Sequence, residues 1–188
     1  MGLKIITAPE KVNFEPDTIY CFLAGGISDC EDWQKETIDY LKALRYEPDE
    51  PDLVILNPRR PEAVINVREQ IEWEFYNINA CDIFSMYFPG GEHKREICMY
   101  ELGRNLALGS NFPSRFIISV QDGYKRLFDV KVQSELVLGL DIVKEHMNPT
   151  LHALDIYNRY KWTVNYNKVG YRRSNGGGAR RGGYYRTV

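Results

Sequence analysis

The stretch "TIYCFLAGGISD", residues Thr18 to Asp29, decides the fold that we expect for this chain. Its first seven residues are mostly apolar and rich in strand-forming side chains, and the two glycines that follow favour a tight turn. Ser28 or Asp29 can then cap a helix. In the next segment, "CEDWQKETIDYLKALRY", the apolar residues recur at helical spacing: Trp33, Ile38, Leu41 and Leu44. The sequence therefore predicts a strand, a glycine turn and a helix.

The same alternation of strand and helix continues along the chain. "DLVILNPRRP", residues 52–61, predicts a second strand that stops at Asn-Pro. "DIFSMYFPGG" and "RFIISV" predict a third and a fourth strand. The apolar periodicity of a helix that packs one face against a core occurs twice. It is found in residues 67–80, between the second and third predicted strands, and in residues 95–109, between the third and fourth.

After Val120 the pattern is weaker. Residues 129–147 favour a helix with a strand before it, and residues 149–162 favour a further helix. Strands that alternate with helices of about 12 to 16 residues indicate βαβ units. We therefore expect an α/β fold with a doubly wound, flavodoxin-like or Rossmann-like parallel sheet of about five strands and helices on both faces. This domain is expected to span residues 1–165, with a tail rich in glycine, arginine and tyrosine over residues 166–188.

The composition favours one globular domain in the cytoplasm. The chain has 188 residues, of which 44% are hydrophobic and 27% are charged. No apolar run reaches the roughly 18 residues of a membrane span, and the N-terminal residues lack the apolar block of a signal peptide. The four cysteines include no CxxC pair, and the three histidines form no HExxH motif. We therefore expect free thiols, no metal site and no membrane partner.

Ligands of doubly wound sheets bind beyond the carboxyl ends of the strands. Three predicted loops reach that edge: "AGGISD", "NPRRP" and "PGGEHKRE". Glycine allows a close backbone approach, arginine and lysine supply cations, and a helix N-terminus favours anions. Each loop alone is also typical of an ordinary turn or a solvated surface. Their convergence predicts a binding site formed by Ala24, Gly25, Gly26, Asn57, Arg59, Lys94 and Arg95.

The glycine pair is not a dinucleotide-binding motif. "AGGISD" lacks GxGxxG, and "NPRR" stands where an acidic residue would follow the second strand. A P-loop is also absent from the sequence. These observations disfavour hydride transfer with a dinucleotide and phosphoryl transfer at a P-loop.

Two predicted helices place a carboxylate on an apolar face. In "REICMYELGRNLALG", residues 95–109, Glu101 falls within an apolar arc that includes Ile97 and Leu108. Glu74 lies at the edge of the apolar stripe of the preceding helix. Burial disfavours the charged form of a carboxylate, so a carboxylate at such a position is costly unless something compensates for it. Glu101 either takes part in chemistry or pairs with an arginine at the edge of the core.

Three segments in this order carry a family resemblance: "YCFLAGGIS", "WEFYNINACDIF" and "MYELGRNLALG". Together they resemble the nucleoside 2-deoxyribosyltransferase family and its relatives that hydrolyse the N-glycosidic bond of nucleoside 5'-monophosphates, over about residues 17–120. In the resemblance, the family's nucleophilic glutamate falls on Glu101. The family acid that precedes a strand aspartate by eight residues falls on Glu74, with Asp82 as that aspartate. Family members often carry a tyrosine where this chain has Cys21.

The resemblance implies an enzyme that exchanges or cleaves the N-glycosidic bond of nucleosides, deoxynucleosides or their 5'-monophosphates. Glu101 would attack C1' to form a covalent glycosyl-enzyme, and Glu74 would give a proton to the leaving base. A second base accepts the sugar in a transferase, and water accepts it in a hydrolase. The resemblance implies no cofactor and a homo-oligomer. We expect hydrogen-bond donors around an ionised Glu101, and a raised pKa at Glu74.

The C-terminal tail is chemically distinct from the rest of the chain. Residues 171–188 carry five arginines and no acid, whereas the whole chain has a net charge of -2. Arginine with interleaved tyrosine can bind nucleic acid, although a flexible end is the simpler interpretation. In the resembled transferases, C-terminal residues of a neighbouring subunit help to complete the site, a role open here to Tyr184 and Tyr185.

A non-catalytic alternative stays open at this point. The same scaffold can serve as a nucleotide-binding sensor that signals through assembly or through the basic tail. Glu101 separates the two hypotheses, because a binding protein has no need for an anionic group beside C1', whereas catalysis requires one.

Overall fold

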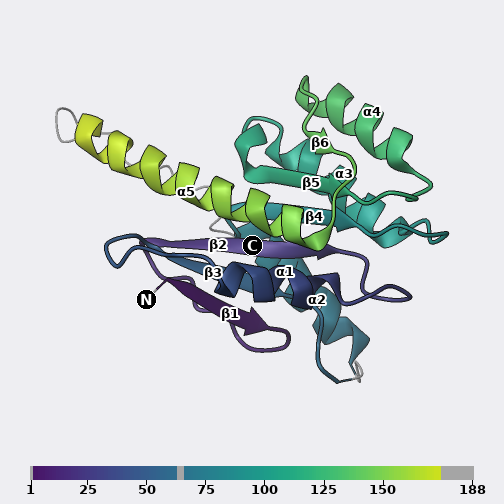
Figure 1. Cartoon of the computed structure of the whole chain (residues 1–188), viewed down its shortest axis with the longest axis horizontal. Coiled ribbons are helices and arrows are strands. Elements are labelled where there is room, and N and C mark those ends of the chain that lie inside the picture. Colours follow the sequence, from purple (N-terminus) through teal and green to yellow (C-terminus); the bar gives the residue numbers. More distant parts are fainter. Residues whose placement is uncertain (1, 63–65, 175–188) are drawn as a thin grey trace.

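The chain folds into a doubly wound α/β structure (Figure 1). The computed structural model describes residues 2–62 and 66–174, with side chains through residue 166, and these residues form one parallel sheet of six strands. The strands are β1 (Leu3–Thr7), β2 (Thr18–Gly25), β3 (Asp52–Asn57), β4 (Ile83–Phe88), β5 (Phe116–Val120) and β6 (Val143–Lys144). The helices are α1 (Trp33–Lys42), α2 (Val67–Ala80), α3 (Glu96–Gly109), η1 (Pro113–Arg115), α4 (Leu127–Leu138) and α5 (Pro149–Ser174).

The helices cover both faces of the sheet. Helices α1 and α5 pack together on one face, where their apolar side chains join the core cluster around Leu53 and Ile55. Helices α2, α3 and α4 lie on the other face, in the cluster around Phe84 and Phe88. Figure 1 shows α1 and α5 on the near side of the strands. The predicted doubly wound fold, with helices on both faces of a parallel sheet, is therefore confirmed.

The strand order positions a ligand crevice. The sheet reads β1-β3-β2-β4-β5-β6, and all neighbouring strands are parallel. The chain leaves β2 for β3 on one side and then crosses to β4 on the other side of β2. In such sheets the loops on either side of this switch point diverge and leave a crevice beyond the carboxyl ends of the strands. The crevice of this chain is thus expected beyond β2 and β4.

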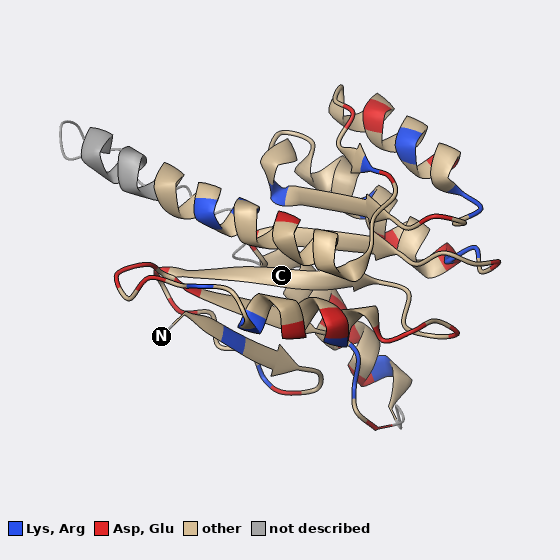
Figure 2. Cartoon of the chain, viewed as in Figure 1, with Lys and Arg blue, Asp and Glu red and all other residues tan. Residues whose placement is uncertain are grey.

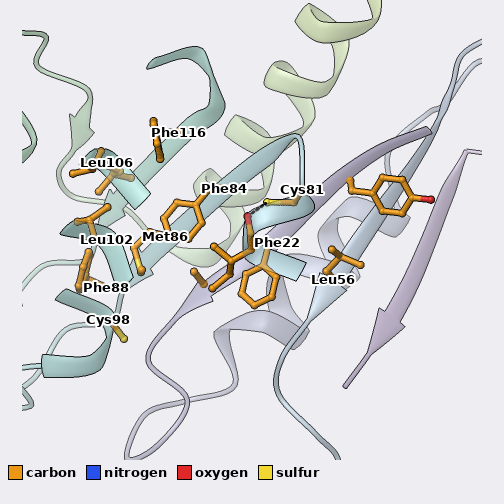
Figure 3. Close-up of a cluster of buried hydrophobic side chains, with 14 of the residues drawn as sticks. Phe22, Leu56, Cys81, Phe84, Met86, Phe88, Cys98, Leu102, Leu106 and Phe116 are labelled. Atoms are coloured by element: carbon orange, nitrogen blue, oxygen red, sulfur yellow. Dashed lines mark hydrogen bonds between the residues drawn. The ribbon is translucent and has the colours of Figure 1, made fainter. Parts of the chain in front are cut away.

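The central strands are buried along their length. Every residue of β4 and β5 is buried, which suits strands covered by helices on both faces. Figure 2 shows charged residues on the helices, on the loops and on the edge strand β1, while β2 is free of them. On the α3 side, Leu102 and Leu106 face the strand residues Phe84 and Phe88 in the core cluster (Figure 3). This packing fixes the rotation of α3, and with it the direction of the Glu101 side chain.

The buried face of α3 is narrower than the sequence predicts. The periodicity placed Ile97 and Leu108 in the core-facing arc, but the two side chains are 70% and 58% exposed. The buried positions of α3 are Cys98, Leu102, Asn105, Leu106 and Gly109. A helix that packs against a sheet on one side buries only part of a 200° arc, so its flanks remain at the surface.

The sequence pattern did not predict two of the strands, β1 and β6. β1 is a parallel edge strand next to β3. β6 is the edge strand on the other side of the sheet, where it pairs with Ile118 and Ser119 of β5. The strand expected before the helix in residues 129–147 is wrong in its position, because α4 comes first. This helix ends at Leu138 and is followed by Gly139, which adopts the left-handed conformation with a φ of 66°. β6 follows that turn.

Helix α5 is longer than the sequence predicts and runs to Ser174. It therefore includes the first residues of the predicted tail, whose boundary at residue 166 stays a prediction. Tyr184 and Tyr185 lie outside the described residues. Within the described chain, none of the helices combines the length and the apolar character needed to cross a bilayer.

A buried histidine joins the sheet to α5. His152 is fully buried on α5, and its two ring nitrogens lie 2.8 Å from the hydroxyls of Ser85 on β4 and Ser119 on β5. Because each serine hydroxyl can donate or accept, a neutral imidazole satisfies both contacts. Burial lowers the pKa of His152 to about 3, with a smaller contribution from Lys144. The folded protein thus holds this ring uncharged.

This histidine makes folding stability depend on pH. The unfolded chain protonates His152 below about pH 6.5, whereas the fold does not until about pH 3, so the contribution of His152 is complete above pH 6.5 and is lost as the pH falls. Between pH 6 and 5, this should cost up to about 1.4 kcal/mol per pH unit. Urea denaturation of the wild type and of His152→Gln across this range should show the slope difference.

The exposed His93 provides the matched control, because its side chain has no hydrogen bond or ion pair among the described residues. His93→Gln should keep the wild-type slope. The pKa of Glu101 is raised in the fold, so Glu101 makes stability fall as the pH rises over the same range. The test therefore compares the slope of stability against pH in the variant with the slope in the wild type. Parallel curves for wild type and His152→Gln would contradict the assignment.

Candidate active site

A cavity of about 520 Å³ lies beyond the carboxyl ends of β2 and β4. Its volume falls in the range of about 300–1,000 Å³ that is usual for small-molecule sites. The lining residues come from β2 and the turn after it, from the loop between β4 and α3, and from α2 and α3: Phe22, Ala24, Gly25, Gly26, Ile27, Ser28, Pro58, Glu74, Glu92, His93, Lys94, Arg95, Glu96, Ile97, Cys98 and Glu101. The cavity therefore occupies the switch point of the sheet.

The turn after β2 is built around close backbone packing. Gly25 has a φ of 147°, and a Cβ at this position would lie 2.2 Å from the backbone oxygen of Tyr87 on β4. The backbone oxygen of Gly26 accepts hydrogen bonds from the indole of Trp33 at 2.7 Å and from the thiol of Cys30 at 3.2 Å. These contacts bring the turn close to β4 and shape the floor of the cavity.

Arg95 ties this turn to the start of α3. It precedes α3 in the left-handed conformation, and its guanidinium donates to the backbone oxygens of Ser28 and Asp29. Arg95 is 9% exposed, and its Nε has no hydrogen-bond partner among the described residues. No described side chain caps the N-terminus of α3. The positive charge of Arg95 and this helix start make this wall of the cavity favourable for an anion.

Glu101 lies in the cavity wall without a partner for its carboxylate. No hydrogen bond or ion pair to this carboxylate occurs among the described residues, so the donors that we expected around Glu101 are not there, and neither is the alternative arginine pair. The nearby Arg104 instead contacts Asn79 at 3.3 Å and stacks on Phe75 at 4.4 Å. Burial, reinforced by Glu74, raises the pKa of Glu101 to about 7, and Arg104 opposes this in part.

Glu74 has a different environment. Its Oε1 accepts a hydrogen bond from Nε2 of Gln70 at 2.7 Å, and Arg60 adds a favourable positive charge. Burial still outweighs both effects and raises the pKa of Glu74, as the sequence analysis expects for a general acid. Each carboxylate therefore resists ionisation, and the charge on Glu74 also raises the pKa of Glu101.

The thiol that lines the cavity is a poor rival to Glu101 as a nucleophile. It belongs to Cys98, and burial, with a contribution from Glu101, raises the pKa of the thiol to about 12. A thiol is a poor nucleophile compared with its thiolate. Within the described residues, no group of three or more His, Cys, Asp and Glu side chains is arranged to hold a metal ion.

The structure brings most of the predicted site residues together. Seven of them line the same cavity: Ala24, Gly25, Gly26, Glu74, Lys94, Arg95 and Glu101. Three others lie elsewhere. Asn57 and Arg59 border a different hollow between β1, β3 and α1, and the Arg59 guanidinium contacts Gln34 and Asp32. Asp82 precedes β4 at the opposite end of the sheet, where it accepts a hydrogen bond from the backbone of Tyr20.

Sequence reasoning missed two elements of the site. Phe22, and not Cys21 or Tyr20, presents its side chain to the cavity from β2. Gln70, which is 9% exposed, was not recognised as the partner of Glu74. The i, i+4 spacing of the two residues on one helix is a signal that could have identified the second element.

Comparison with known protein families matches residues 18–114, just over half of the chain, to the family described as nucleoside 2-deoxyribosyltransferase like. The chain belongs to this family. The matched region begins at β2 and ends within η1, so it contains every residue that lines the cavity. A comparison with curated proteins found no match. The predicted family is confirmed, while the roles of individual residues are a matter of proposal.

The close packing at Gly25 gives a test of how the turn is held. Gly25→Ala should lower the free energy of unfolding by more than about 2 kcal/mol, because the new Cβ meets a backbone oxygen and the residue has a positive φ. Thermal and urea denaturation would measure the loss.

Gly103 is the control for this substitution. It lies on α3 with nothing within 4 Å of an added Cβ. Gly103→Ala should therefore be neutral or stabilise the fold by about 0.5–1 kcal/mol, since alanine favours helix more than glycine does. Equal stabilities for the two variants would show that the turn is not constrained as described.

Proposed function

We propose that this protein exchanges or cleaves the N-glycosidic bond of nucleosides, deoxynucleosides or their 5'-monophosphates through a covalent glycosyl intermediate on Glu101. The observation that carries the proposal is the pair of carboxylates, Glu74 and Glu101, that lines one cavity at the switch point of the sheet. Two carboxyl groups in different surroundings suit retaining chemistry at an anomeric carbon. The family of the chain supports the same class of substrate.

The reaction divides into two displacements. In the first, a Glu101 carboxylate oxygen forms a bond to C1' while the bond from C1' to the base nitrogen breaks, and Glu74 gives its proton to the base. In the second, a new base or a water attacks C1' and releases Glu101. Glu74 then takes up the proton of the attacking group, which restores both carboxyl groups to their starting state.

The surroundings of Glu101 favour this role. A carboxylate without hydrogen-bond partners is poorly stabilised, and it gains on forming an ester that is neutral. A bound pentose can supply the donors that the described residues lack, because its hydroxyls can donate to the carboxylate. Substrate binding thus lowers the cost of ionising Glu101 at the moment when the nucleophile is needed.

The start of α3, with Lys94 and Arg95 before it, favours a substrate with a 5'-phosphate, although Glu92 and Glu96 line the same cavity. The N-terminus of α3 has no side-chain cap, and Lys94 has no acidic partner among the described side chains. A phosphate can accept hydrogen bonds from the first backbone N–H groups of α3 and from Lys94, and charge-assisted bonds are the stronger ones. The buried Arg95 adds a positive charge beside them. We therefore place nucleoside 5'-monophosphates ahead of nucleosides as substrates.

The proposal includes a homo-oligomer and a cytoplasmic location. Exposed apolar side chains follow one face of α2 and α3 beside the carboxylates: Val67, Ile71, Phe75, Ile97, Tyr100 and Leu108. The stacking of Arg104 on Phe75 makes the two helix faces continuous. A second copy of the chain would cover this self-complementary face and shield the cavity from water. The four free thiols support a reducing compartment.

Product analysis tests the catalytic proposal. The protein should release free base from deoxynucleosides or, more efficiently, from their 5'-monophosphates, as measured by chromatography with and without an added acceptor base. Release without acceptor identifies a hydrolase, and a new nucleoside that forms only with acceptor identifies a transferase. Glu101→Ala should lower turnover by more than about 1,000-fold while the fold remains intact, because the nucleophile is removed.

Intact-protein mass spectrometry provides a second readout, since a glycosyl adduct should accumulate on wild type and be absent from Glu101→Ala. Unchanged turnover in Glu101→Ala would contradict the mechanism. No product from any substrate, together with measurable nucleotide binding, would favour the non-catalytic sensor instead.

The oligomer is tested on the apolar face of α2 and α3. Ile71→Glu introduces a charge at a residue that is 59% exposed and does not line the cavity, so it should convert an oligomer to monomers in sedimentation velocity. Leu136→Glu, at a residue 74% exposed on α4, should leave the assembly unchanged. A wild type that is monomeric throughout, or equal effects of the two substitutions, would contradict the proposed interface.

A further inference from the structure

Of the four glutamates that line the cavity, Glu74 and Glu101 affect each other's ionisation, and their carboxyl groups differ in hydrogen bonding. This difference decides which of the two carries a proton. We propose that Gln70 is a positioning residue which, by donating to Glu74, keeps the proton shared by Glu74 and Glu101 on Glu101 until a substrate binds. The inference rests on the proposed function for the roles of the two carboxyl groups. Its basis is the network that holds the Gln70 side chain.

The orientation of the Gln70 amide is fixed by its neighbours. Nε of Arg60 lies 2.5 Å from Oε1 of Gln70, and since arginine can only donate, this oxygen must face it. Nε2 of Gln70 then donates to the backbone oxygen of Pro58 at 2.8 Å and to Glu74 at 2.7 Å. Arg60 is held in turn by Glu69 at 2.9 Å, and its side chain is 7% exposed. Rotation of the amide would break all three bonds of Gln70.

This network favours the charged form of Glu74 over that of Glu101. A carboxylate accepts the Gln70 bond more strongly than a carboxylic acid does, so the bond opposes protonation of Glu74. The charged groups that act most strongly on this pair are Arg60 at Glu74 and Arg104 at Glu101, each carboxylate also acts on the other, and the thiol of Cys98 lies beside both. Five further charged or titratable residues line the same cavity from the loop before α3 and from its start: Glu92, His93, Lys94, Arg95 and Glu96. Each carboxylate has one arginine nearby, and among the described residues a hydrogen-bond donor reaches Glu74 but not Glu101.

The ligand-free protein is therefore held in an inactive protonation state. Glu101 carries the proton that Glu74 needs as an acid, and Glu74 carries the charge that Glu101 needs as a nucleophile. When the hydroxyls of a bound pentose donate to Glu101, its ionised form gains the stabilisation that it lacked, and the proton leaves Glu101 while Glu74 takes one up. The pair keeps a net charge of about -1 throughout, because one proton is exchanged between two groups.

This arrangement protects the cavity against unproductive reactions. An uncharged Glu101 does not attract cations or react with small electrophiles, and an ionised Glu74 cannot protonate a group that is not in place. Binding of the correct sugar changes both states together. The coupling is a form of substrate-dependent activation that needs no movement of the backbone.

Carbon-13 NMR of the full chain, labelled at the side-chain carboxyl carbon of glutamate, locates the proton. In the ligand-free wild type, one resonance should titrate near pH 7, and this resonance should vanish in Glu101→Gln but persist at a lower midpoint in Glu74→Gln. In Gln70→Leu, the midpoint of Glu74 should rise by about one pH unit or more, and that of Glu101 should fall.

The catalytic pH profile is the second readout. In Gln70→Leu, both limbs of the kcat/KM profile should move to higher pH, because every state with a charge on Glu74 is destabilised. Gln70→Glu keeps the size of the side chain and the acceptor for Arg60 but replaces the donor by an anion, so its shift should be larger. This variant keeps the test valid if Gln70→Leu does not fold.

Gln34 is a matched control on the other face of the sheet. It is a fully buried glutamine whose Oε1 accepts from Nε of Arg59 at 3.0 Å, as Gln70 accepts from Arg60. Gln34→Leu should lower stability without moving the carboxyl titration or the pH profile. A merely structural role for Gln70 predicts that both glutamine variants behave in this way.

The outcomes separate the inference from the proposed function. A high-midpoint resonance that belongs to Glu74, or a titration that Gln70→Leu and Gln70→Glu leave unchanged, would overturn the inference even if the enzyme turns over nucleotides. If no substrate is turned over, the proposed function fails, and the carbon-13 titration still shows where the proton lies.

Discussion

The close contact between the turn after β2 and the end of β4 is the constraint on which the site depends. Because a Cβ at Gly25 would meet the backbone oxygen of Tyr87, only glycine lets the two strand ends come this near. Trp33, Cys30 and Arg95 also donate hydrogen bonds to backbone oxygens of this turn. As a result, the crevice that every doubly wound sheet has at its switch point becomes a bounded cavity with a fixed floor.

The electrostatics of the cavity follow from that enclosure. Glu101 and Glu74 come from separate helices, and the packing of each helix on the sheet sets the direction of its carboxylate. Enclosure disfavours both charges, and proximity makes each charge unfavourable for the other. Such a pair costs stability, which a purely structural core has no reason to retain. A cavity that binds and transforms a ligand gives it a role.

The parts of the structure that sequence could predict are those set by local pattern. Hydrophobic periodicity identified β2, β3, β4 and β5, and it gave the bounds of α2 as they are observed. The position of Glu101 on the cavity side of α3 followed from the same periodicity. The edge strands β1 and β6 were not recognised. β6 has two residues, and β1, with one buried residue among its five, lacks the apolar run of a central strand. The pairing of both strands depends on neighbours that are distant in sequence.

The site residues that sequence could not place are those decided by side-chain direction in loops. Arg59 and Arg60 are adjacent, and as a pair they suggested a cationic patch for substrate. In the structure the two side chains point to different helices. Arg59 contacts a buried glutamine of α1, and Arg60 contacts a buried glutamine of α2. A buried glutamine needs a donor for its oxygen, and a nearly buried guanidinium needs acceptors. Each arginine therefore donates to a glutamine of a neighbouring helix and is not available to bind a ligand. Only Arg60 affects the proposed chemistry, and it does so through Gln70. The cations left for a substrate are therefore those at the start of α3, where the helix terminus adds its own positive end.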